Sequence, residues 1–149
     1  MQNDPYFLRV ARGEVILSQV SKMLGWKFVH YDDDAMKVQV EYDAEQVLTN
    51  PLGCIQGGIL SAMLDDAMGP AVYITLPTPL LAVTIESKTS FISPAQPGKI
   101  KGIGKIVRKT GSIVFTEGFL HNAEGDLIAT GSATFKLGKY GRMPIPWQG

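Results

Sequence analysis

The residues best suited to chemistry lie in one segment, which runs from Asn50 to Asp65. The sequence turns helical at Gly58, so Gly57 lies at the start of a helix, where backbone N–H groups are unpaired and the helix dipole favours negative charge. A glycine there lets a carbonyl group approach closely. Asp65 carries a carboxylate that can act as a general base toward water or attack directly as a nucleophile. Together these groups could support attack on a substrate carbonyl, with Gly57 as the oxyanion donor.

Other catalytic chemistries find less support in the sequence. Cys54 has no histidine or other base placed beside it, so we expect a buried, unreactive thiol. No Gly-x-Ser-x-Gly segment indicates serine catalysis. One cysteine and two histidines argue against a disulfide framework and a zinc site. The carboxylates at positions 32–34 fit a solvated hairpin turn better than a cation site, so we expect no metal.

Length and composition favour one ordinary globular domain. The chain has 149 residues, of which 45% are hydrophobic, and its 14 basic and 14 acidic residues give a net charge of zero. That balance argues against a general nucleic-acid binder. The N-terminus lacks the pattern of a secretory signal, and the most apolar stretch, 70–85, is too short and too rich in proline for a membrane span. We therefore expect a cytoplasmic protein with no membrane or nucleic-acid partner.

Hydrophobic periodicity predicts a helical N-terminal segment, two strands, one central helix and four strands. The N-terminal segment covers residues 5–24, and the central helix runs from Gly58 to about Ile74. Pro70 is expected to interrupt this helix, and Pro77 and Pro79 to close it. The expected strands are 26–31, 36–42, 81–92, 99–108, 113–121 and 127–137, followed by an irregular tail over 138–149. This order predicts a single α+β domain over 1–149, with an antiparallel sheet wrapped around the central helix.

The segment from Asn50 to Asp65 resembles the active-site signature of hotdog-fold acyl-CoA thioesterases of the phenylacetate-pathway (PaaI-like) type. That signature runs Asn, two residues, Gly, two residues, His-Gly-Gly, and then an Asp seven residues after the second Gly. The residues that match are Asn50, Gly53, Gly57, Gly58 and Asp65. The element order and the segments 91–95 and 129–135 are similar too, so the resemblance covers about residues 25–137. It implies a hotdog fold and hydrolysis of an acyl- or aryl-CoA thioester to the free acid and coenzyme A.

The resemblance also implies a role for each matching position. Asp65 would be the base or nucleophile, and its register is favoured over that of Asp66, because successive helix positions point about 100° apart. Asn50 would orient its loop or polarise the carbonyl. Thr84 would hold the attacking water beside the aspartate, although threonine is also common in strands. The histidine of the family is Gln56 here, which can donate a hydrogen bond near the thioester but cannot take a proton.

A second part of the sequence suits the coenzyme. Residues 87–116 contain no acidic residue but six of the 14 basic ones. Such a stretch suits a polyanion such as the phosphates of coenzyme A. The lysines at 99, 101, 105 and 109 share one alternating strand face, so they could also simply face water. In the family the corresponding turn contributes to coenzyme A binding, which implies contacts from Arg108, Lys109, Thr110, Gly111 and Ser112. Coenzyme A would be part of the substrate, so no separate cofactor is expected.

The spacing of the two central residues has a consequence for assembly. Gly57 and Asp65 are separated by about 12 Å along one helix. One chain cannot easily bring both to a single carbonyl carbon. Two chains related by a two-fold axis, with antiparallel helices, can do so. We therefore expect a dimer, or a dimer of dimers, with shared active sites, as the hotdog resemblance also implies.

Two other functions remain as alternatives. A non-catalytic hotdog protein that binds acyl-CoA would explain Gln56. A hotdog dehydratase or hydratase would need a catalytic histidine, and neither His30 nor His121 lies in such a motif. The acyl group is not specified by the sequence. The candidates for lining its pocket are Met63, Met68, Tyr73 and Phe91.

Overall fold

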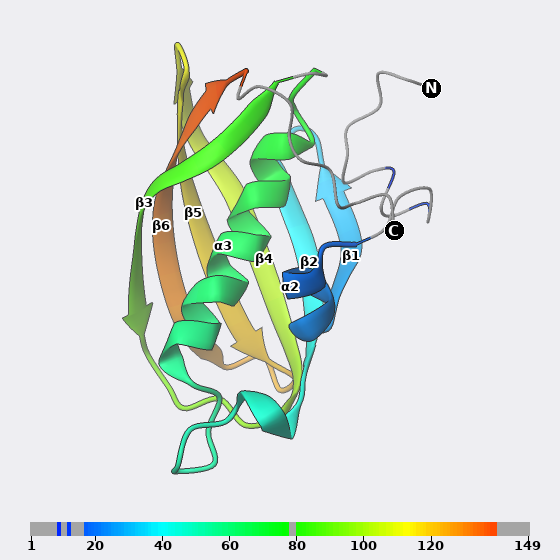
Figure 1. Ribbon diagram of the computed structural model, residues 1–149, viewed down its shortest axis with the longest axis vertical. Coiled ribbons are helices and arrows are strands. Elements are labelled where there is room, and N and C mark those ends of the chain that lie inside the picture. The colour runs from blue at the N-terminus through cyan, green and yellow to red at the C-terminus, as the bar shows by residue number, and fades with distance from the viewer. Residues whose placement is uncertain (1–8, 10–11, 13–16, 78–79, 140–149) are drawn as a thin grey trace.

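The structure is a computed structural model, and it describes residues 9, 12, 17–77 and 80–139 of the chain. Helix α3 (Gly57–Tyr73) lies against one face of a six-stranded antiparallel sheet (Figure 1). The order across the sheet is β1-β2-β4-β5-β6-β3. The strands are β1 (Trp26–Asp32), β2 (Lys37–Ala44), β3 (Leu81–Phe91), β4 (Gly98–Thr110), β5 (Ile113–Asn122) and β6 (Leu127–Gly138). This is the predicted hotdog arrangement, in which the sheet curves around one helix.

The element boundaries follow the hydrophobic pattern closely. All six predicted strands are present, and the central helix starts at Gly57 instead of Gly58. The predicted helical segment at the N-terminus falls largely on residues outside the described part of the chain. Within the described part, it can be compared only with the short helix α2 (Gln19–Met23). Of the predicted irregular tail, Gly138 belongs to β6 and residues 140–149 lie outside the described part. A short 3-10 helix, η1 (Gln46–Leu48), precedes the loop that leads into α3.

Pro70 does not interrupt α3, contrary to the prediction from the sequence. Proline has no N–H, so it leaves the carbonyl group of Asp66, one turn earlier, without its helical donor. The indole Nε1 of Trp26 donates to that carbonyl at 3.1 Å. One turn later the N–H of Ile74 donates to the carbonyl of Pro70 at 3.0 Å. The helix continues because a side chain from β1 supplies the missing hydrogen bond.

The sheet approaches α3 closely where glycines face the helix. A Cβ atom on Gly104 of β4 would lie 2.0 Å from the carbonyl oxygen of Ala67, so only glycine fits this crossing. The α3 side chains beneath the sheet are fully buried and include Met63 and Met68. These methionines therefore belong to the core, contrary to the expectation from the sequence that they line an acyl pocket. None of the helices in the described part of the chain is long and apolar enough to span a membrane.

Candidate active site

Asp65 and Thr84 are brought together by the packing of α3 on β3. The Thr84 hydroxyl donates to Asp65 Oδ1 at 2.8 Å. Strand β3 is fixed nearby, because the Tyr73 hydroxyl donates to the carbonyl of Ala82 at 2.6 Å and accepts from its N–H at 3.1 Å. No hydrogen bond to Asp65 Oδ2 is recorded among the described residues. The carboxylate is thus oriented through one oxygen, while the other can interact with water or substrate.

The adjacent Asp66 lies in different surroundings. Its Oδ1 accepts from the Ser21 hydroxyl at 3.2 Å, and Ser21 in turn accepts from Ser18 at 2.7 Å. Its Oδ2 is buried without a hydrogen-bond partner among the described residues. Burial raises the pKa of Asp66 to about 6; the Ser21 hydrogen bond opposes this shift and the charge of Asp65 adds to it. Asp66 therefore faces α2, whereas Asp65 faces the hydroxyl of β3.

The start of α3 presents unpaired backbone donors. The N–H of Gln56 donates to the carbonyl of Leu48 at 2.9 Å, and the carbonyl of Gln56 accepts the first helical hydrogen bonds. Among the described residues, no partner is recorded for the N–H groups of Gly57 and Gly58. The Gln56 side chain is exposed and does not cap the helix. Two N–H groups at the positive end of the helix dipole can therefore donate hydrogen bonds to a negatively charged atom of a ligand.

Asn50 organises the loop before this helix. Its Oδ1 accepts from the N–H groups of Leu52 at 2.9 Å and Cys54 at 3.2 Å, and its own N–H donates to the carbonyl of Cys54 at 2.7 Å. Because Oδ1 is engaged twice, the amide can offer a ligand only its Nδ2 hydrogens. Cys54 itself is only half-buried, and Gln96 Nε2 donates to its sulfur at 3.5 Å. The thiol is more accessible than expected.

The predicted coenzyme A turn lies far from Gly57 in the same chain. The loop before β4 contacts the α3 end, since the N–H of Ile55 donates to the carbonyl of Ala95 at 2.8 Å. Strand β4 then runs for 13 residues, about 40 Å, to the turn that carries Gly111. Figure 1 shows this turn at the opposite end of the sheet from the start of α3. One chain therefore does not bring the turn and Gly57 together.

A bulge redistributes the basic side chains of β4. The pairing with β5 shifts between Ile106 and Arg108, which places Arg108 opposite the exposed Phe115 and Lys109 opposite the buried Val114. Residues paired across an antiparallel ladder share a face. Arg108 thus lies on the outer face, and the expectation that Lys109 shares a face with the other lysines is wrong. In the turn, the Ser112 hydroxyl accepts from Lys136 Nζ.

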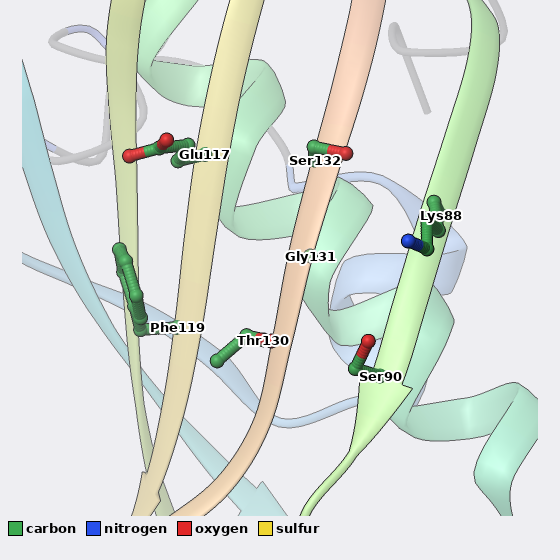
Figure 2. A pocket seen from close by; sticks show the side chains of 7 residues that line it. All are labelled: Lys88, Ser90, Glu117, Phe119, Thr130, Gly131 and Ser132. Atoms are coloured by element: carbon green, nitrogen blue, oxygen red, sulfur yellow. The ribbon is translucent and has the colours of Figure 1, made fainter.

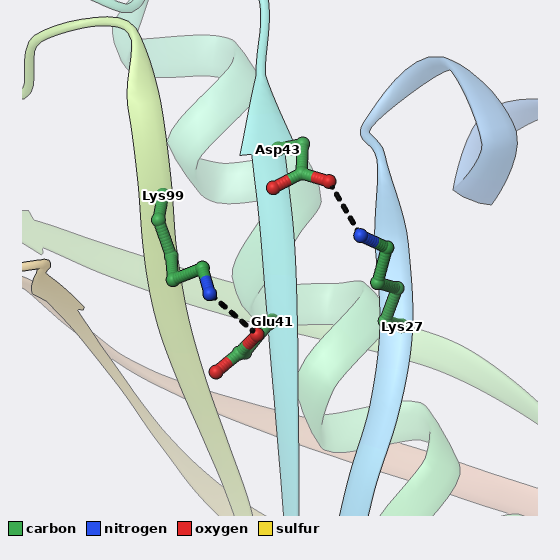
Figure 3. A network of polar contacts seen from close by, with 4 residues as sticks. All are labelled: Lys27, Glu41, Asp43 and Lys99. Atoms are coloured by element: carbon green, nitrogen blue, oxygen red, sulfur yellow. Dashed lines mark hydrogen bonds and ion pairs between the residues drawn. The ribbon is translucent and has the colours of Figure 1, made fainter.

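Ion pairs occupy the outer face at the other end of β4. Lys99 pairs with Glu41 at 3.3 Å, and Lys27 pairs with Asp43 at 2.7 Å (Figure 3). The hydrogen bond from Lys27 holds the pKa of Asp43 below its usual value. Toward the turn, Lys105 lies between a lysine of β2 and Glu117 of β5, and no ion pair of Lys105 or Arg108 is recorded in the described residues. Lys105 and Arg108 therefore place two positive charges on this face between the ion pairs and the turn.

A polar hollow lies on the outer face of the sheet, away from α3. Lys88 and Ser90 of β3 reach toward it, and Phe119 and Glu117 of β5 form its other side (Figure 2). Gly131 of β6 also lines it, and the inner side of this glycine packs on Leu64 of α3. The hollow and Asp65 are therefore on opposite faces of the sheet. Within the described part of the chain, no three His, Cys, Asp or Glu side chains gather where they could hold a metal ion.

Comparison with known proteins gives consistent similarities. Residues 52–129 match the family model described as the thioesterase superfamily. A candidate thioesterase of Ralstonia eutropha JMP134, described as related to phenylacetic acid degradation, is 34% identical, with a TM-score of 0.84 over 88% of this chain and 98% of that chain. A candidate esterase of Saccharolobus solfataricus is 28% identical over 73% of this chain and 76% of its own length. A Bacillus halodurans protein solved with CoA shares the fold, with a TM-score of 0.76 and 22% identity over 90% of this chain and 87% of that chain.

Proposed function

The chain belongs to the thioesterase superfamily, and from this premise we propose that it is an acyl-CoA thioesterase that releases a free acid and coenzyme A. The observation that carries the proposal is the Asp65 carboxylate, which Thr84 orients at 2.8 Å on the helix that begins with the unpaired N–H of Gly57. A base and an oxyanion donor are the two groups that thioester hydrolysis requires.

In the proposed reaction, the Gly57 N–H donates to the thioester carbonyl oxygen and stabilises the charge that develops there. Asp65 takes a proton from a water molecule as the water oxygen attacks the carbonyl carbon. The tetrahedral intermediate then breaks its C–S bond, and the leaving thiolate receives the proton from Asp65. In the nucleophilic variant, Asp65 attacks the carbonyl carbon and the C–S bond breaks to release the coenzyme A thiolate. Water then hydrolyses the resulting anhydride to the free acid and the Asp65 carboxylate, and the proton that this releases is taken up by the thiolate. Gln56 positions the thioester, and Asn50 contributes its Nδ2 hydrogens.

The site is proposed to be shared between two chains. Gly57 and Asp65 lie about 12 Å apart along α3, too far to act on one carbonyl carbon. Strand β3 is an edge of the sheet, and its side chains include Val83 and Ile85, of which Ile85 is 57% exposed. Exposed apolar edge strands are sites of chain association. Pairing of two chains along β3 would bring Asp65 of the partner subunit toward Gly57.

The same pairing also serves the coenzyme. The turn with Arg108, Lys109, Thr110, Gly111 and Ser112 is about 40 Å along β4 from the α3 start of its own chain. A second chain related by a two-fold axis would run in the opposite direction and would bring its own basic turn toward the start of α3 in the first chain. The Bacillus halodurans relative was solved with CoA, which supports coenzyme A as the anion. Lys105 and Arg108 would supply the positive charge that its phosphates need.

Hydrolysis of a panel of aromatic and aliphatic acyl-CoA thioesters, followed by release of free thiol, tests the proposal. The wild-type protein should turn over at least one substrate, and Asp65→Asn should lose nearly all activity while keeping its fold and its affinity for coenzyme A. Asp66→Asn is the matched control, because it removes the neighbouring carboxylate and should retain activity. An unchanged rate in Asp65→Asn would remove that residue from the mechanism. Binding without turnover across the panel would instead indicate an acyl-CoA-binding protein.

A further inference from the structure

Phe91 covers the residue that presents the oxyanion donor. It is the last residue of β3 and pairs with Ala129, on the side of the sheet that faces α3. A Cβ atom on Gly57 would lie 3.3 Å from both Cε1 and Cζ of the Phe91 ring. The ring therefore leaves less space at Gly57 than a Cβ atom ordinarily has. The rest of the ring is open, since the side chain is 56% exposed.

The direction of this contact places the ring beside the donor. In an α-helix the Cα–Cβ bond tilts toward the N-terminus, which is also the direction in which the free N–H groups point. A ring that touches the Cβ position of Gly57 therefore borders the space in front of the Gly57 N–H. A carbonyl group bound to that N–H would have one of its two substituents next to Phe91.

The surroundings of Phe91 suit the acyl substituent better than the coenzyme. Ile92, the next residue, is 55% exposed, so the end of β3 offers apolar surface. The acyl chain is apolar, whereas the phosphates of the coenzyme need cations. Neither Phe91 nor Ile92 carries a charge that could hold a phosphate.

We propose that Phe91 determines acyl specificity at this site: its ring occupies the space beside the acyl α-carbon, so that chains unbranched at this carbon are accepted and α-branched chains are rejected. This inference rests on the proposed thioesterase function. The ring already lies close to Gly57, so little space remains on the helix side into which it could move to admit a branch. A methyl branch would meet the ring instead.

Butyryl-CoA and isobutyryl-CoA test the inference, because they have equal numbers of carbons and differ in α-branching. The wild-type kcat/KM should favour butyryl-CoA by about tenfold or more, as expected for a methyl group that fits or fails to fit a pocket. Phe91→Ala should lower this preference to about twofold, chiefly by a gain on isobutyryl-CoA. Phe91→Trp should increase it. Phe119→Ala is the matched control, because it removes the same side chain from the outer face of the sheet and should leave the ratio unchanged.

An unchanged ratio in Phe91→Ala, or an equal loss on both substrates, would overturn the role of Phe91 while leaving the thioesterase function in place. If the wild-type protein hydrolyses no thioester, the proposed function fails instead. In that case, calorimetry tests the inference with S-(2-oxoalkyl) coenzyme A ketones, which are matched to the two thioesters. The affinities of the linear and the α-branched ketone are compared. A preference for the linear ketone that Phe91→Ala abolishes would support the steric role, and equal affinities in the wild-type protein would overturn it.

Discussion

The Thr84 hydroxyl donates a hydrogen bond of 2.8 Å to the carboxylate of Asp65, although the two residues are 19 positions apart and lie on different elements. This bond joins the middle of the buried helix to an exposed edge strand. A carboxylate held through one oxygen keeps the other oxygen free in a fixed orientation, which is what a base or a nucleophile requires. Substitution of Thr84 therefore tests the proposed role of Asp65 directly.

Thr84→Val should lower kcat by about tenfold or more, because a hydrogen bond to a charged group is worth about 1.5–3 kcal/mol. Thr84→Ser keeps the hydroxyl and should retain most of the activity. Initial rates on a substrate from the acyl-CoA panel measure both variants. Because Thr84 is exposed, the thermal midpoint of neither variant should change much, which separates loss of positioning from loss of fold. Equal rates for the valine and serine variants would show that the hydroxyl has no function.

Mixing of two inactive variants tests the shared site. Asp65→Asn and Gly57→Val should each be inactive alone. If each site takes Gly57 from one chain and Asp65 from the other, a mixed dimer has one site with both changes and one intact site. Refolding an equal mixture should then restore roughly a quarter of the wild-type activity, because about half of the dimers are mixed. Activity that stays at the level of the separate variants would place each site within one chain.

Gln56→His restores the residue type of the family signature and should preserve or raise turnover. Histidine can donate the same hydrogen bond and can also ionise near neutral pH, so the pH profile of kcat should gain an ionisation at about pH 6.5. Gln56→Ala is the matched control, which removes the side-chain donor and should lower turnover. Because Gln56 is exposed, we expect both variants to fold like the wild-type protein. A histidine variant that behaves like the alanine variant would argue that this side chain does not meet the thioester.

Much of the fold follows from local patterns, and the departures follow from contacts that no local pattern contains. The helix start at Gly57 and the six strands are marked by glycines, turn residues and alternation. Pro70 was expected to break the helix, but its effect is cancelled by Trp26, 44 residues earlier. The face of Lys109 was also misjudged, because a bulge adds one residue to β4 without a sequence signal.

The candidate site was predictable only in part for the same reason. The signature indicates Gly57 and Asp65 as candidates by spacing, but the proximity of Phe91 to Gly57 depends on where β3 ends relative to α3. The sequence indicates Phe91 as a pocket candidate but does not indicate that it lies beside Gly57. The burial of Asp66 was not anticipated at all, because it depends on α2 and Ser21 packing against α3.

The buried Asp66 carboxyl predicts an unusual dependence of stability on pH. Its pKa in the folded state is raised from 3.8 to about 6, so folding favours the protonated form. The stability that this form contributes is fully present below about pH 4 and is lost as the pH rises through about 6. One pKa unit corresponds to about 1.4 kcal/mol, so the loss is at most about 3 kcal/mol. Asp66→Asn cannot ionise and should escape this loss.

Urea unfolding of the wild-type protein and of Asp66→Asn at intervals between pH 4 and pH 7 measures the effect. The free energy of unfolding of the wild-type protein should fall relative to that of the variant across this range, and the difference should become constant above about pH 7. Asp34→Asn, at an exposed turn position, is the control, and its difference from the wild-type protein should not follow the same curve. Parallel curves for the wild-type protein and Asp66→Asn would mean that the carboxyl ionises as freely in the folded chain as in the unfolded one. The Oδ2 atom, which has no partner among the described residues, would then have to be hydrated or paired with a positive charge, because either would offset the cost of burying its charge.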